Sequence, residues 1–324
     1  MKSILKKRII SLIIISSLLL LNACGAKINY DTKRLINNLY LANEDMFAVG
    51  TAKNIVVPDV YNEKEVDNVG AESYFVASLD RQKSNYIKYH NAYKKMPMAS
   101  LTKLMTALIV LENCDDLNKE FYVSPDDVDL EKDESTANLR SGDRLRVIDL
   151  LYGLLVPSGN DAALVLANNL VGNYDNFIIM MNNEAERLGA LNTHFANPHG
   201  LNSDYHFTTA YDLFLITREL AKYDIFKEIT SSKEYTANIY QSDGTIRTEK
   251  WVNTNLFVTE ELLLSTNTKL LGTKTGNTEA AGSCLVLYVE DNNKKNKYIS
   301  VVLKAKTKRN SYYNTNALLS GIPN

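Results

Sequence analysis

The sequence predicts an α+β fold in which strands from both ends of the chain form one sheet beside a helical lobe. Runs of alternating apolar and polar residues, typical of strands, occur before the region 124–227 and again after it. Within that region the apolar residues recur at helical spacing, and glycine or proline ends most of the runs. We expect the functional site in the cleft between the two lobes, since ligands often bind between lobes.

Each expected element has its own signal. Apolar residues at 101, 104, 105, 108 and 109 predict a helix that begins at Ser100. Pro157 ends the next helix, and Gly172 and Gly189 follow the two after it, as glycine often follows a helix end. The expected helices, besides the one from residue 100, are 147–156, 161–170, 176–188 and 311–319. The expected strands are 74–79, 86–89, 234–239, 245–251, 270–274, 283–289 and 298–303.

The composition is that of a globular protein with more than one lobe. At 324 residues the chain exceeds the length at which single cores usually stop growing. Its 45% apolar and 23% charged residues are ordinary for a folded protein. A formal net charge of −2 gives no broad basic field, so nucleic acid is not expected as a partner.

The N-terminus has the pattern of an export signal. Basic residues at 2 and 6–8 precede an apolar run, 9–21, that is too short to span a bilayer comfortably. The run ends in Leu-Asn-Ala-Cys24, which resembles a bacterial lipobox. We expect 1–23 to be a lipoprotein-type signal peptide, Cys24 to carry lipid, 24–69 to be a polar tether and 70–324 to be the folded domain.

The protein would then be anchored to the outer face of the cytoplasmic membrane, or secreted. Two alternatives stay open for the N-terminus: cleavage by the ordinary signal peptidase, because Asn22 is unusual in a lipobox, and an uncleaved anchor helix. The other two cysteines, Cys114 and Cys284, are expected to be small buried residues, with a disulfide between them as the alternative.

The most informative motif is Ser-x-x-Lys at 100–103. Residues three apart lie on the same face of a helix, so Lys103 can reach the hydroxyl of Ser100. A lysine acts as a base only when it is neutral, which requires burial or a nearby cation such as Lys274 to lower its pKa. Backbone N–H groups at the start of the helix would stabilise an oxyanion. Taken alone, Ser100 would more simply be a helix N-cap.

Two further motifs follow in order, Ser-Gly-Asn at 158–160 and Lys-Thr-Gly at 274–276. At a turn between helices, Ser158 could relay a proton and Asn160 could hold a substrate amide, although turn chemistry alone also explains these residues. At a strand end, Lys274 and Thr275 suit a substrate carboxylate, and Gly276 leaves room for substrate along the edge. A solvated strand end is the simpler alternative. One acyl-transfer site would explain all three motifs together.

The histidines invite a metal hypothesis, because His194, His199 and His206 lie close in sequence while His90 lies apart. Neither a His-Glu-x-x-His pattern nor a paired-cysteine spacing accompanies them. We therefore expect packing or loop-fixing roles for the histidines, no metal and no cofactor.

At these motifs the chain resembles the penicillin-binding D-alanyl-D-alanine carboxypeptidases, the low-molecular-weight serine DD-peptidases. The resemblance runs from about residue 71 to 319 and extends beyond the short motifs. Its segments are PMASLTKLMT (97–106), LLYGLLVPSGNDAA (150–163), NPHGL (197–201) and KTGNT (274–278), continuing to Ala281-Gly282.

The resemblance implies a fold and a set of residue roles. The fold would be of the β-lactamase and DD-peptidase type, with a five-stranded antiparallel sheet flanked by helices and a helical lobe at about 124–227. Ser100 would be the acylated nucleophile, Lys103 its base and Ser158 an aid to proton transfer. The backbone N–H groups of Ser100 and Asn277 would form the oxyanion hole. The substrate-binding residues would be Asn160, Lys274, Thr275, Gly276 and Arg309.

By this resemblance, 70–324 is expected to be a catalytic domain that removes the terminal D-alanine from peptidoglycan stem peptides and is acylated by β-lactams. The alternatives are a β-lactamase, a DD-endopeptidase and a catalytically silent lipoprotein that binds the wall or senses β-lactams, while a zinc peptidase is disfavoured. Because the chain ends soon after Arg309, the C-terminal β-domain and membrane helix of many members are expected to be missing. No Glu-x-x-x-Asn loop of the class A β-lactamases is found, so penicillin is expected to leave Ser100 slowly.

Overall fold

The computed structural model describes residues 66–79 and 87–322. All of them lie in the second of two compact units of the chain, Asn54–Asn324. The expected signal peptide, Cys24 and nearly all of the tether lie outside the described residues, so those expectations stay predictions. Within the described ranges, no helix combines the length and apolar character needed to cross a membrane.

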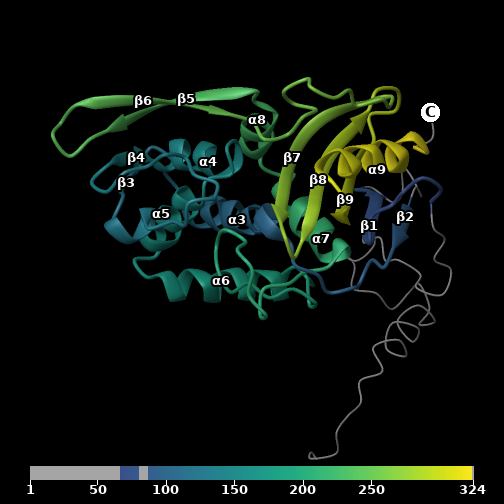
Figure 1. The fold of residues 1–324 in the computed structure, drawn as a ribbon, viewed down its shortest axis with the longest axis horizontal. Helices are drawn as coiled ribbons and strands as arrows, with labels where there is room; N and C mark the ends of the chain where they lie inside the picture. The colour runs from purple at the N-terminus through teal and green to yellow at the C-terminus, as the bar shows by residue number, and fades with distance from the viewer. Residues whose placement is uncertain (1–65, 80–86, 323–324) are drawn as a thin grey trace, which may run out of the picture. The chain divides into compact units, whose positions relative to one another are not determined.

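The main sheet has five antiparallel strands in the order β2-β1-β9-β8-β7 (Figure 1). Strand β1, from near the start of the described chain, pairs with β9, from near its end, so the prediction of one sheet built from both ends is confirmed. The strands are β1 Ser73–Ser78, β2 Ile87–His90, β7 Thr268–Thr278, β8 Gly282–Asp291 and β9 Lys297–Ala305.

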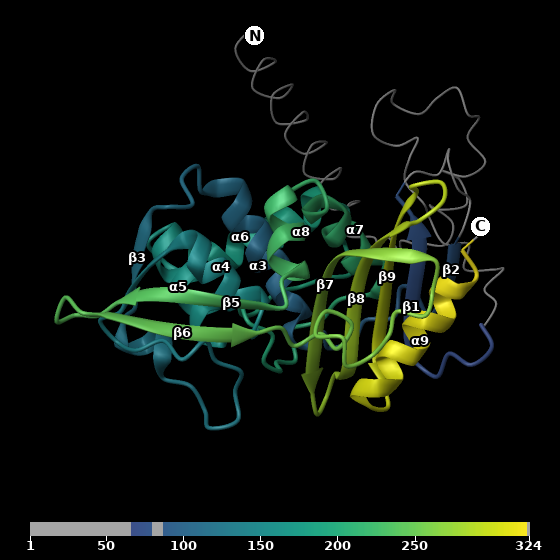
Figure 2. The same cartoon turned by 90° about the horizontal axis from the view of Figure 1, so that it is seen from above.

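The central strands of this sheet are buried on both faces. Neighbouring residues along a strand point to opposite sides of the sheet, so they belong to different cores. Leu285 and Leu287 of β8 pack in a core with Leu318 of α9 (Lys308–Ser320). Val286, between them, belongs to the other core, which the helical lobe fills. Figures 1 and 2 show α9 lying along the sheet at its C-terminal strands.

The helical lobe surrounds α3, whose first eight residues are all buried. This helix contacts α4, α5, α6 and α7, so its side chains are enclosed on nearly every side. The helices are α3 Lys103–Asn113, α4 Val147–Leu155, α5 Asn160–Leu170, α6 Tyr174–Arg187, α7 Ala210–Leu220 and α8 Asp224–Ser231. The expected helices agree with these to within a few residues.

The structure also has a second sheet, which the sequence did not predict. Four strands form a separate sheet in the order β3-β4-β5-β6, in which β5 and β6 make a long ribbon beside the helical lobe (Figure 2). In β5 only alternate residues near its end are buried, whereas β8 is buried almost throughout, and this one-sided burial marks a strand that covers a surface. The strands are β3 Glu120–Tyr122, β4 Arg144–Arg146, β5 Glu234–Tyr240 and β6 Ile246–Val252.

Neither described cysteine is bridged. Cys114 follows α3 and is partly exposed, while Cys284 is buried in β8, and both are free. Burial raises the pKa of the Cys284 thiol to about 12. The disulfide alternative is therefore wrong, and Cys284 is an unreactive core residue.

Candidate active site

Ser100 lies in a tight turn that precedes α3. The chain forms a 3-10 helix, η3 (Ala99–Thr102), and the α-helix begins only at Lys103. Ala99 has a positive φ of 48°, which turns the chain sharply just before Ser100. The caps of these helices are Met98 and Thr102, so the interpretation of Ser100 as an N-cap is wrong. The side chain of Ser100 is left partly exposed and available for chemistry.

Lys103 is fully buried and points back at Ser100. Its Nζ lies 3.0 Å from Ser100 Oγ, 2.7 Å from Asn160 Oδ1 and 2.8 Å from the carbonyl oxygen of His199. A lysine has three N–H donors when charged, and three acceptors surround this one. The side chain is therefore held in one position, with Ser100 Oγ within hydrogen-bonding distance.

Burial lowers the pKa of Lys103 well below its ordinary value, and the positive charge of Lys274 lowers it further. The carboxylates of Asp161 and Glu134 act in the opposite direction and raise the pKa. The net lowering of the pKa makes the neutral amine easier to form than in an exposed lysine, and a neutral amine can accept the proton of a serine hydroxyl. Lys103 thus lies within hydrogen-bonding distance of Ser100 with a lowered pKa, and its role as a base stays a prediction.

The Ser-Gly-Asn turn brings a second hydroxyl into the site. Ser158 has a φ of 68°, Gly159 is the N-cap of α5, and Asn160 is its first residue. Lys274 Nζ donates to Ser158 Oγ at 2.8 Å and to the carbonyl of Thr275 at 2.9 Å. Lys274 is also fully buried, and burial lowers its pKa to about 7. A strand of the sheet and a turn of the helical lobe therefore meet at these two side chains.

The rest of the Lys-Thr-Gly strand end borders the same space. Thr275 Oγ1 lies 2.7 Å from Thr254 Oγ1. A Cβ on Gly276 would come within 3.0 Å of the carbonyl oxygen of Met98 and 3.2 Å of Ala99 Cβ. Gly276 thus lets β7 pass close to η3, a need that the sequence interpretation had missed. Room for substrate beside this glycine stays a prediction.

The two remaining candidates lie near the ends of their elements. Asn277 is exposed near the end of β7, and its side chain accepts from Ser283 Oγ at 3.0 Å. Arg309 is exposed in the first turn of α9. The roles of Asn277 in an oxyanion hole and of Arg309 in carboxylate binding stay predictions.

The 197–201 segment supports Ser100 and Lys103, a function that sequence motifs did not reveal. The carbonyl of His199 accepts from Lys103, and the next residue, Gly200, has a φ of 102°. A Cβ on Gly200 would collide with the carbonyl of Ala99. The histidines fix loops, as expected: His206 Nε2 lies 2.7 Å from Thr102 Oγ1. In the described part of the chain, no cluster of side chains is suited to a metal ion.

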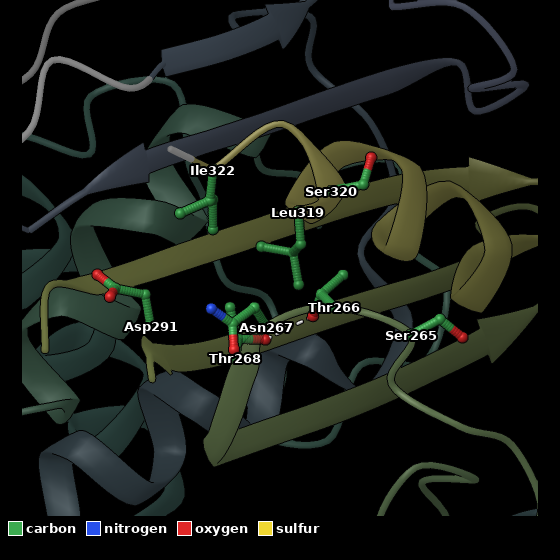
Figure 3. Close-up of a pocket in the computed structure, with 8 residues that line it drawn as sticks. All are labelled: Ser265, Thr266, Asn267, Thr268, Asp291, Leu319, Ser320 and Ile322. Atoms are coloured by element: carbon green, nitrogen blue, oxygen red, sulfur yellow. Dashed lines mark hydrogen bonds between the residues drawn. The ribbon is translucent and has the colours of Figure 1, made fainter. Parts of the chain in front are cut away.

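A pocket of about 230 Å³ lies away from Ser100, and its lining includes residues of β7, β8 and α9 (Figure 3). Thr268, in its wall, begins β7 six residues before Lys274, a separation of roughly 20 Å along a strand. Asp291 also lines this pocket, but its carboxylate accepts from three backbone N–H groups of the turn after β8. This pocket is therefore not part of the acyl-transfer site.

The fold and the geometry around Ser100 define a class: proteins of the DD-peptidase fold, in which a buried lysine faces a partly exposed serine. The chain belongs to the D-alanyl-D-alanine carboxypeptidase family, which matches residues 60–307.

Individual relatives agree with this family. The chain is 33% identical over 269 residues to the D-alanyl-D-alanine carboxypeptidase DacC of Escherichia coli, covering 79% of this chain and 62% of that protein. It is 29% identical over 246 residues to the D-alanyl-D-alanine carboxypeptidase DacF of Bacillus subtilis, covering 75% and 60%. The crystal structure of a Streptomyces DD-transpeptidase matches with a TM-score of 0.69 and 27% identity, covering 79% of this chain and 97% of that one. The match spans less than two thirds of the length of the first two relatives.

Proposed function

We propose that the protein is a serine-type carboxypeptidase that removes the terminal D-alanine from peptidoglycan stem peptides through an acyl-enzyme on Ser100. One observation carries the proposal: buried Lys103 lies within hydrogen-bonding distance of Ser100 Oγ, and buried Lys274 donates to Ser158 across the site. Membership of the D-alanyl-D-alanine carboxypeptidase family supports the substrate class.

In the proposed first step, Ser100 Oγ attacks the carbonyl carbon of the penultimate D-alanine while Lys103 takes the hydroxyl proton. Backbone N–H groups of Ser100 and Asn277 would stabilise the oxyanion. As the intermediate collapses, the C–N bond breaks, and the proton that Lys103 took from Ser100 passes through Ser158 to the leaving amine. Free D-alanine departs and the acyl ester stays on Ser100. Water then attacks this ester while Lys103 takes a proton from the water. As the C–O bond to Ser100 breaks, Lys103 returns this proton to Ser100 Oγ and is neutral again.

The substrate's terminal carboxylate would bind at the strand end. Lys274 supplies a buried N–H donor, Thr275 a hydroxyl, and Arg309 a permanent positive charge. The amide of Asn160 would hold the peptide backbone on the other side. The same arrangement would accept a β-lactam, which presents a carbonyl and a carboxylate at similar spacing.

The test begins with purified protein and a peptide ending in D-Ala-D-Ala. We expect release of free D-alanine, and we expect Ser100→Ala to abolish it. Thr102→Ser, in the same turn, is the matched control, since it keeps a hydroxyl at a position that the mechanism does not use. Equal release by the Ser100→Ala variant would refute the assignment of the nucleophile.

Fluorescent penicillin separates the alternative enzymes. A long-lived labelled band, mapped by peptide mass to Ser100, supports the carboxypeptidase, whereas rapid turnover of the label would indicate a β-lactamase. Cleavage of cross-linked muropeptides without D-alanine release would indicate an endopeptidase. A silent binding protein would bind muropeptides and release nothing.

We also propose that Cys24 carries the lipid that holds the domain outside the cytoplasmic membrane. The apolar run and the Leu-Asn-Ala-Cys pattern support this localisation. Cells fed a labelled fatty acid should label the wild-type protein and leave the Cys24→Ser variant unlabelled. Equal labelling of both would contradict the proposal.

A further inference from the structure

Glu134 is an acidic residue beside the site that none of the sequence motifs includes. It lies in the connection between η4 (Pro125–Val128) and β4, and its side chain is partly buried. One carboxylate oxygen accepts from Asn160 Nδ2 at 2.7 Å, and the other accepts from a backbone N–H at 3.1 Å. The oxygen of the same carboxamide, Asn160 Oδ1, accepts from Lys103 Nζ at 2.7 Å. Hydrogen bonds therefore run without interruption from Glu134 to Lys103.

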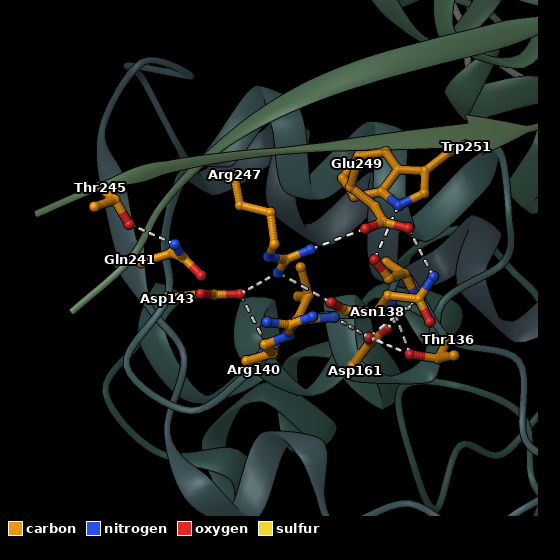
Figure 4. A network of polar contacts seen from close by, with 12 residues as sticks. Thr136, Asn138, Arg140, Asp143, Asp161, Gln241, Thr245, Arg247, Glu249 and Trp251 are labelled. Atoms are coloured by element: carbon orange, nitrogen blue, oxygen red, sulfur yellow. Dashed lines mark hydrogen bonds and ion pairs between the residues drawn. The ribbon is translucent and has the colours of Figure 1, made fainter. Parts of the chain in front are cut away.

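The segment that carries Glu134 is fixed by buried polar contacts (Figure 4). Asp161, almost fully buried, accepts twice from the backbone N–H of Ala137, at 2.8 and 3.0 Å. Trp251 Nε1 donates to the carbonyl of Ala137 at 2.9 Å. Further along, Arg247 of β6 donates to the carboxylate of Asp143 at 2.7 Å. Helix α5 and strand β6 thus hold the segment from two sides.

This segment also packs directly onto the Ser-Gly-Asn turn. The backbone N–H of Asn160 donates to the carbonyl of Ser135 at 2.8 Å. A Cβ on Gly159 would lie 2.8 Å from the backbone nitrogen of Ala137, so only glycine fits where these two segments of the backbone meet. Glu134 is the residue before Ser135 and cannot move far from Asn160.

The carboxamide of Asn160 needs a partner that selects its orientation. Its two ends have nearly the same shape, but one end only accepts hydrogen bonds and the other only donates. An ionised carboxylate only accepts, so Glu134 selects the orientation in which the NH₂ group faces it and the oxygen faces Lys103. The reversed amide would place its N–H groups against the amine of Lys103.

We propose that Glu134 is a positioning residue for acyl transfer: it holds the carboxamide of Asn160 so that the oxygen of this amide keeps Lys103 on Ser100. The residue does not touch the reacting atoms. It acts through Asn160, and the proposal rests on the function proposed above for Ser100 and Lys103.

The charge of Glu134 has a second consequence. Four charged or titratable groups face Lys103: Lys274 from β7, Asp161 from α5, Glu134 from the connecting segment, and His199, whose own pKa is lowered to about 3, largely by burial. Burial and Lys274 lower the pKa of Lys103, whereas Asp161 and Glu134 raise it. Removing the charge of Glu134 should therefore lower the pKa of Lys103 and leave the amine neutral down to a lower pH.

The experiment compares Glu134→Gln and Glu134→Ala with Asp133→Asn, an adjacent exposed residue whose change removes the same charge. The second-order rate of acylation by fluorescent penicillin is measured between about pH 4 and about pH 10. We expect Glu134→Ala to lower the maximal rate about tenfold or more, because a misplaced base is costly. In the plot of acylation rate against pH, we expect Glu134→Gln to move the acidic limb to a pH lower by at least about half a unit. The Asp133→Asn profile should match the wild type.

Two outcomes separate this inference from the proposed function. If the wild type is acylated and both Glu134 variants, folded by circular dichroism, give its rate and profile, Glu134 has no positioning role. If the wild type itself is not acylated, the proposed function fails instead. The inference is then tested without substrate, by following the ¹³Cε resonance of Lys103 during a pH titration, assigned through its loss in Lys103→Arg. An identical pKa of Lys103 in the wild type and in Glu134→Gln would overturn the inference.

Discussion

At the scale of single residues, the site contains two strained backbone positions. Ala99, before the nucleophile, has a φ of 48°, and Ser158 has a φ of 68°. Residues with a Cβ are disfavoured in this left-handed region by roughly 1–2 kcal/mol each. The contacts of the two residues explain why the strain persists. Lys274 donates to Ser158 Oγ, and the turn at Ala99 makes Ser100 face Lys103. Residues held in such sparsely populated conformations recur at active sites.

Substitutions at Ser158 separate its backbone from its hydroxyl. Ser158→Ala removes the hydroxyl and keeps the strain, whereas Ser158→Gly removes both. We expect both variants to lose most of the acylation rate. We expect Ser158→Gly to be more stable than Ser158→Ala by about 0.5–1 kcal/mol, because glycine adopts a positive φ freely. Urea unfolding of the two variants measures the difference. A glycine variant less stable than the alanine variant would argue against strain at this residue.

Lys274 makes stability depend on pH. Burial lowers its pKa in the folded protein from 10.5 to about 7. Between about pH 7 and about pH 10 the unfolded chain holds a proton on this amine that the folded protein lacks, so the folded state gains stability as pH rises. Below about pH 7 both states hold the proton, and the folded state bears the full cost of a buried charge.

Replacing Lys274 should therefore change the free energy of unfolding by an amount that depends on pH. We expect the unfolding free energy of Lys274→Met, relative to the wild type, to fall by on the order of a few kcal/mol from pH 7 to pH 10. Lys269→Met, at an exposed position of the same strand, should show no such change. Unfolding in urea at both pH values measures the difference. A pH-independent difference for Lys274→Met would mean that burial does not shift this pKa.

At the scale of elements, the nucleophile turn is enclosed by two glycines from distant segments. Gly276 of β7 lies against Met98 and Ala99 on one side. Gly200 lies against the carbonyl of Ala99 on another, with its φ of 102° closed to most side chains. The position of η3 is therefore set by close backbone contacts with a strand and a loop.

Gly200→Ala tests this enclosure. Its Cβ would collide with the Ala99 carbonyl, so we expect a loss of roughly 2–4 kcal/mol in stability together with a strong loss of acylation. Gly172→Ala is the matched control: its φ is 69°, but no atom lies within 4 Å of the added Cβ. The control should cost only about 1 kcal/mol and leave acylation unchanged. Equal effects of both changes would show that backbone strain alone, and not contact with η3, explains them.

The elements of the main sheet could be predicted because their patterns are local and strong. The apolar run of β8 and the helical spacing after Ser100 each identify an element without reference to the rest of the chain. The second sheet could not be predicted, because β3 and β4 have three residues each and β5 shows only which residues are apolar, not which surface they cover. Strand pairing depends on tertiary contacts that periodicity does not contain.

At the scale of the whole molecule, the residues of the proposed active site come from both lobes. Lys103 belongs to the central helix, Ser158 and Asn160 to a turn of the helical lobe, and Lys274 to the edge strand of the sheet. The three motifs could be found in the sequence because each is a short run of characteristic residues. Glu134 and the carbonyl of His199 could not, because only the folded loops bring them to Asn160 and Lys103.

An acyl group on Ser100 should consequently stabilise both lobes at once. It would occupy the space between Asn160 of α5 and Thr275 of β7. The ester itself survives unfolding, but the contacts of the acyl group with the two lobes exist only in the folded protein, and these contacts favour the folded state. We expect penicillin to raise the thermal midpoint by several degrees and to slow amide hydrogen exchange in 134–160 and in 268–278. Ser100→Ala should show neither change. Slower exchange confined to η3 and α3 would mean that the acyl group does not contact both lobes. The same protection in the Ser100→Ala variant would mean that the protection does not come from an acyl group on Ser100.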